Sequence, residues 1–204
     1  MMKKNIKIVI HELKHHIPFT FGATLIAIIL VVIVLYATNL IISESLFKAT
    51  HFAHLFASAV VSTAIFYKYK DNFIMALLIG VTGALVIGSL SDIIVPYLGA
   101  RLFLFDTQFD LPLIEQPIIV LLILLSGGLV GISTKITKVP HFIHIFLSVF
   151  ASLFYLLAFS SSLTPLFFLS AFISIFIAVL IPCCLSDIVL PPLFLGNKLK
   201  QCKC

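Results

Sequence analysis

The sequence HFAHLFASAVVS at residues 51–62 recurs as HFIHIFLSVFAS at residues 141–152, with the histidines, two serines and two phenylalanines in register. A second motif follows each copy, LSDIIVP at 90–96 and LSDIVLP at 185–191. Two polar motifs that keep the same order within otherwise apolar sequence indicate an internal duplication.

The sequence around these motifs has the composition of a membrane protein. Hydrophobic residues make up 61% of the 204 residues and charged residues 10%, whereas soluble domains carry about 45–50% and about 25%. Six apolar runs can cross about 30 Å of hydrocarbon as helices, because the bilayer core accepts only helices or closed barrels and the runs lack the alternation of strands. The runs are 19–42, 51–67, 73–98, 117–134, 141–159 and 165–195.

Basic residues predict how the chain crosses the membrane. Eleven of the thirteen lie before the first run, between the second and third, between the fourth and fifth, or after the sixth; Lys48 and Arg101 are the exceptions. Lysine and arginine are enriched in cytoplasmic loops. We therefore expect a multi-pass protein of the cell membrane with both termini in the cytoplasm.

The predicted fold is an all-α integral membrane protein with six transmembrane helices arranged as two inverted three-helix repeats. A unit of three spans is odd, so its second copy must enter the bilayer upside down, as in many secondary transporters. Glycines 127, 128 and 131 are expected to allow close helix packing. The predicted segments are a cytoplasmic amphipathic His-rich segment (1–18), the first repeat (19–98), an extracytoplasmic loop (99–116), the second repeat (117–195) and a cytoplasmic basic CxC tail (196–204).

The histidines and serines of each copy share one helix face, since positions i, i+3, i+7 and i+11 fall within roughly 80° of one another. Consecutive spans are antiparallel. We therefore expect His51 and His54 near Asp92 on the outward side, and His141 and His144 near Asp187 on the cytoplasmic side. An ionisable residue inside a span is costly and indicates function.

Two imidazoles and a carboxylate form a ligand set for a divalent metal ion such as zinc, iron or manganese. The sequence thus favours a transporter of a divalent transition-metal cation with one His/His/Asp station per repeat, with protons as a candidate coupling ion. Cys183 and Cys184 would make the inner station softer. The structural alternative is that the histidines bond backbone groups at helix ends and that each aspartate caps a half-helix.

Other functions compete with transport. His11 and His15 belong to an HExxH motif, which zinc metalloproteases use, so an intramembrane metalloprotease is one alternative. A haem or redox membrane protein is another. The repeat accounts for more of the sequence than an enzyme does. The expected partners are the lipid bilayer, a metal ion or small cation, and a second copy or accessory subunit. Nucleic acid is not expected, because topology accounts for the basic residues.

Overall fold

A computed structural model describes residues 2–39, 41–135, 138–161 and 163–183, and its regular structure over these ranges is helical. Helices α3, η1 and α4 follow one another without a break, as do α8 and η2, and η1 and η2 are π-helical. The elements are α1 (Met2–Thr38), α2 (Glu44–Tyr69), α3 (Phe73–Ser89), η1 (Leu90–Ile94), α4 (Val95–Leu102), α5 (Pro112–Glu115), α6 (Pro117–Thr134), α7 (Lys138–Phe159), α8 (Pro165–Ala178) and η2 (Val179–Cys183).

Five of the described helical segments are long and apolar enough to cross a membrane. The fifth predicted span, 141–159, contributes a shorter apolar helix over its described residues, Ile143–Phe159. The bundle also carries many exposed apolar side chains, several of them along α1, which suits a surface in contact with lipid. The five segments are Ile17–Thr38, Glu44–Lys68, Phe73–Leu102, Pro117–Thr134 and Pro165–Pro182.

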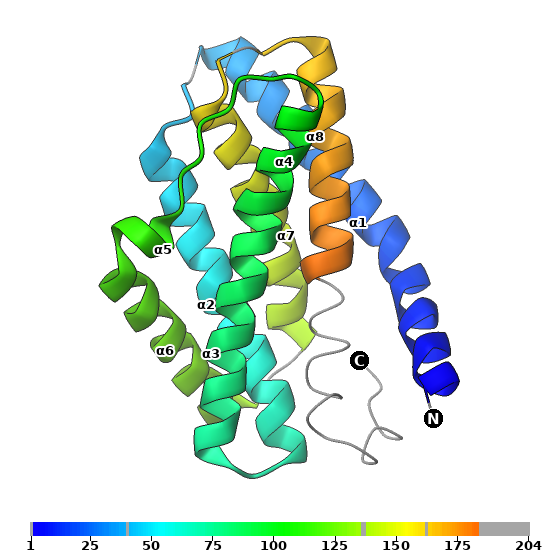
Figure 1. Cartoon of the computed structure of the whole chain (residues 1–204), viewed down its shortest axis with the longest axis vertical. Coiled ribbons are helices and arrows are strands. Elements are labelled where there is room, and N and C mark those ends of the chain that lie inside the picture. Colours follow the sequence, from blue (N-terminus) through cyan, green and yellow to red (C-terminus); the bar gives the residue numbers. More distant parts are fainter. Residues whose placement is uncertain (1, 40, 136–137, 162, 184–204) are drawn as a thin grey trace.

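Helix α2 occupies the centre of the bundle, packed against α3, α6 and α7, while α1 flanks α7 and α8 (Figure 1). The start of α1 and the turn between α2 and α3 lie at one end of the bundle. The connections from α1 to α2, from α4 to α5 and from α7 to α8 lie at the other end (Figure 1). Side chains on α2 can therefore reach both halves of the chain.

Two helices begin earlier than their apolar runs predict. Helix α1 starts at Met2 and includes Pro18, so the predicted cytoplasmic segment is continuous with the first span. Helix α2 starts after Ser43, whose hydroxyl accepts a hydrogen bond from the Leu46 N–H at 3.3 Å. This N-cap adds a polar first turn and gives α2 26 residues, which is ample for a span.

Glycines bring α6 into backbone contact with α2. A Cβ atom added at Gly127 would lie 2.6 Å from the carbonyl oxygen of Phe56, and one at Gly131 would lie 2.4 Å from that of Val60. Only glycine leaves room for such an approach, so the predicted role of these glycines in close helix packing is confirmed.

Candidate functional site

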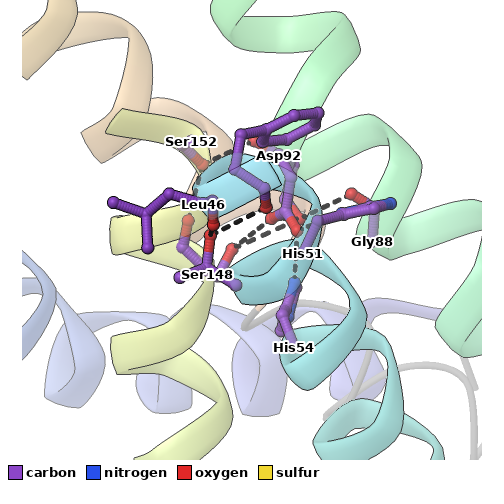
Figure 2. Close-up of polar contacts among 10 residues, drawn as sticks. Leu46, His51, His54, Gly88, Asp92, Ser148 and Ser152 are labelled. Carbon is purple, nitrogen blue, oxygen red and sulfur yellow. Dashed lines mark hydrogen bonds and ion pairs between the residues drawn. The ribbon is translucent and has the colours of Figure 1, made fainter. Parts of the chain in front are cut away.

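The most polar part of the buried core is built around one carboxylate. Asp92 is fully buried, and its Oδ2 atom lies 2.8 Å from His51 Nδ1 and 2.7 Å from His54 Nδ1. Both histidines come from α2, three residues apart, and both side chains point toward Asp92 (Figure 2). The antiparallel hairpin of α2 and α3 produces this contact, as the sequence predicted.

Serine hydroxyls satisfy the second carboxylate oxygen. Ser91 Oγ and Ser148 Oγ each lie 2.9 Å from Asp92 Oδ1. Ser148 belongs to α7, so the buried carboxylate joins the two halves of the chain (Figure 2). Four donors around one carboxylate are the arrangement that makes a buried negative charge tolerable.

A π-helical turn places Asp92 among these donors. In η1 the Val95 N–H donates to the carbonyl oxygen of Leu90, five residues back, and Pro96 has no N–H to offer the Asp92 carbonyl. The Ser91 carbonyl thereby loses its usual partner, the N–H four residues on. Ser152 on α7 replaces that partner, with its Oγ 3.0 Å from the Ser91 oxygen. Such turns occur frequently at functional sites.

A glycine lets α3 approach the histidines. A Cβ atom added at Gly88 would lie 2.4 Å from Leu55 Cδ2 and 4.0 Å from His54 Nδ1. The absent side chain leaves space for Leu55 next to the His54 ring, so the hairpin can close on Asp92.

The predicted separation of the two histidine pairs is wrong for His144. Its ring lies parallel to that of His54, with centroids 5.9 Å apart. Because α2 begins at Glu44, His51 lies about 10 Å along the helix from its start and not at its end. Residues expected at opposite membrane faces therefore meet at one place, where His144 is fully buried.

The other predicted site residues remain untested. The backbones of His11, His15, His141 and Cys183 are helical, but their side chains are not among those described. Cys184 and Asp187 lie outside the described residues. A cytoplasmic station at His141 and Asp187 thus stays a prediction, as does a metal site at the HExxH motif.

The hydrogen bonds to Asp92 also fix the chemistry of the two rings. A carboxylate oxygen can only accept, so each Nδ1 carries the proton and donates it to Asp92. When such a ring is neutral, its Nε2 atom bears the lone pair and is the atom that can bind a metal. Asp92 therefore orients and polarises the imidazoles. The sequence had placed Asp92 among the metal ligands themselves.

A second polar cluster, which the sequence analysis did not anticipate, lies at the start of α2. Lys48 pairs with Glu44 on the same helix and with Glu115 at the end of α5. Asp110, in the preceding loop, completes the cluster. The spacing of Glu44 and Lys48 could have indicated their pair, but nothing local indicates that the loop folds back onto them.

Burial, followed by the adjacent Glu115 carboxyl group, raises the pKa of Asp110 to about 6. Lys48 acts in the opposite direction on Glu115, because its hydrogen bond lowers the pKa of that carboxyl group. Asp110 thus holds its proton more tightly than Glu115 does.

Comparison with protein-family models, with curated proteins and with solved structures finds no match to this chain.

Proposed function

We propose that the protein is an integral membrane transporter of a divalent transition-metal cation, and that His51 and His54 bind the ion in the core of the bundle. The observation that carries the proposal is the shared carboxylate Asp92, which holds the Nδ1 atoms of both rings on one oxygen. Histidine ligands of metal ions commonly donate their other ring N–H to a carboxylate in this way.

Charge balance supports a cation at this place. With both histidines neutral, Asp92 leaves one negative charge in the buried core. Among the residues that the structure describes, its only ion-pair partners are His51 and His54. Neutrality then requires a proton on an imidazole or a bound cation. Protons and metal ions would compete for the same nitrogen atoms, which is the basis for proton-coupled transport.

The architecture that we propose has six spans, with α7 as the fifth, and two inverted repeats. Its support is that the polar faces of α2 and α7, which carry the duplicated sequence, meet at Asp92 through His54, Ser148 and their neighbours. A binding site between the two repeats is the arrangement that alternating access uses. The distribution of lysines supports a topology with both termini in the cytoplasm.

The geometry gives less support to the other candidate functions. The two histidines that share Asp92 lie on one face of α2, so they do not approach one haem iron from opposite sides. The HExxH motif lies on α1, which packs against α7 and α8 and makes few contacts with the α2–α3 hairpin. A protease would have to use a separate site.

Uptake of zinc, iron(II) or manganese(II) into liposomes that contain the purified full-length protein tests the proposal. We expect uptake by the wild type, loss of uptake in His51→Ala, and a fall of about 10–100-fold in metal affinity in Asp92→Asn. Asp106→Asn is the matched control, because Asp106 is exposed and its pair with Arg101 lies at the surface. Equal uptake by His51→Ala and the wild type would refute the proposal.

A further inference from the structure

Three acidic side chains converge at the end of the bundle where α2 begins. Oxygen atoms of Glu44, Asp110 and Glu115 all lie within 4.8 Å of one another. They come from the first turn of α2, from the loop after α4 and from the end of α5. Three carboxylates from separate elements can surround one cation, which a run of neighbouring acids on one helix does not do.

Asp110 provides an independent indication of a ligand. The residue is only 9% exposed. Its Oδ1 atom is buried and receives no hydrogen bond from any described donor. The neighbouring Glu115 carboxyl group can bond to Asp110 only if the two share a proton. An ionised Asp110 therefore lacks a positive partner of its own.

Lys48 neutralises only part of the cluster. Its ammonium group contacts Glu44 and Glu115. When all three acids are ionised, two negative charges remain in excess, one of them on the buried Asp110. A divalent cation would balance both.

We propose that Glu44, Asp110 and Glu115 form a binding site for a hard divalent cation of the calcium class, separate from the histidine centre. Carboxylate oxygens are the ligands that calcium prefers, and its flexible coordination accepts exposed groups and water beside a buried oxygen. Imidazole, in contrast, suits transition metals. Sites of this type outside cells bind calcium with Kd values of about 10⁻⁴–10⁻³ M.

The cation would tie the loop that contains Asp110 to the start of α2. Lys48 and His51 lie three residues apart on that helix, so the cluster is one helical turn from the histidine centre. Lys48 would compete with the cation for Glu44 and Glu115. Removing Lys48 should then strengthen binding, whereas removing an acid should weaken it.

Isothermal titration of the purified full-length protein with calcium chloride tests this site. We expect saturable binding by the wild type, weakened at least about tenfold in Asp110→Asn and Glu115→Gln. Binding should strengthen in Lys48→Gln and stay unchanged in Asp106→Asn, a loop acid outside the cluster. Glu115 is exposed, so its variant is expected to fold even if a change at Asp110 does not allow folding.

Three results would overturn the proposal. The first is that the wild type binds no calcium at concentrations up to about 10 mM, well above the expected Kd. The second is that Glu115→Gln binds calcium as tightly as the wild type does. The third is that Lys48→Gln binds calcium more weakly than the wild type does. His51→Ala separates the two sites, because it should abolish zinc binding and leave calcium binding intact.

Discussion

At the scale of single residues, Asp92 is the group on which the core depends most. Replacing it with alanine leaves four buried donors without an acceptor, two on imidazole rings and two on serines. We expect Asp92→Ala to lower the free energy of unfolding by roughly 3 kcal/mol, since each unsatisfied buried group costs about 1–3 kcal/mol and relaxation recovers part of this. Denaturant unfolding in detergent measures the change. Asp106→Ala should stay within about 0.5 kcal/mol of the wild type, and an Asp92→Ala protein of equal stability would contradict the role of Asp92 in the core.

Whereas replacing Asp92 should destabilise the protein, replacing Asp110 with asparagine should stabilise it at high pH. The pKa of Asp110 is raised to about 6, above the ordinary value of 3.8. The protonated form therefore contributes stability that is complete below about pH 4 and is lost as the pH rises through 6. An asparagine at this position donates a hydrogen bond as the protonated acid does, at every pH. We expect Asp110→Asn to raise the unfolding temperature by about 2 °C at pH 8 in the absence of divalent cations, with no gain at pH 4.

The same titration governs calcium binding. Glu44 and Lys48 on α2, Glu115 on α5 and Tyr155 on α7 are the ionisable groups around Asp110. Asp110 changes charge near pH 6, so calcium affinity should fall between pH 7 and pH 5. Titrations at the two pH values measure this. If the calcium affinity of Asp110→Asn falls equally between pH 7 and pH 5, the proton that weakens binding belongs to another group.

Sequence reasoning predicted some contacts of single residues and missed others for a physical reason. The contact of His51 with Asp92 follows from the helical hairpin, in which the start of one helix must lie beside the end of the next. The contact of Ser148 with Asp92 depends on which helices pack together, and apolar periodicity does not specify that. Asp110 joins Glu115 and Lys48 through a loop whose path is set by tertiary contacts.

At the scale of helices, a comparison of Gly131 with Gly22 tests the close approach of α6 to α2. A methyl group at Gly131 would collide with the Val60 carbonyl group at 2.4 Å, whereas one at Gly22 would meet nothing within 4 Å. We expect Gly131→Ala to destabilise the protein by about 1–3 kcal/mol through overpacking. Gly22→Ala should be neutral or stabilise α1 by up to about 1 kcal/mol. Unfolding in detergent measures both, and equal effects would contradict the close packing of α6 on α2.

The positions of most helices were predictable from the sequence, but helix ends were less so. Apolar runs indicated where the helices lie, while Ser43 extends α2 by a polar turn that hydropathy alone does not detect. That extension moved His51 and His54 into the interior of the bundle. The π-helical turn at Leu90–Ile94 was also missed, although Pro96 gave a signal that the α-helical bonding pattern fails there.

At the scale of the whole molecule, the duplicated sequence takes on a different meaning once the helices are packed. The repeat suggested one polar station near each membrane face. In the fold, His54 and Ser148, which come from different copies, belong to one polar core around Asp92. We therefore expect the metal centre at Asp92 to be shared by the two halves instead of belonging to the first repeat alone.

Calorimetric titration of the detergent-purified, full-length protein with zinc is the most direct test of this centre. We predict about one tightly bound ion per chain, lost in His51→Ala. In Ser148→Ala, which removes a donor contributed by the second half, binding should weaken by about tenfold. Two equivalent tight sites in the wild type, or undiminished binding in His51→Ala, would contradict a single shared metal centre at His51, His54 and Asp92.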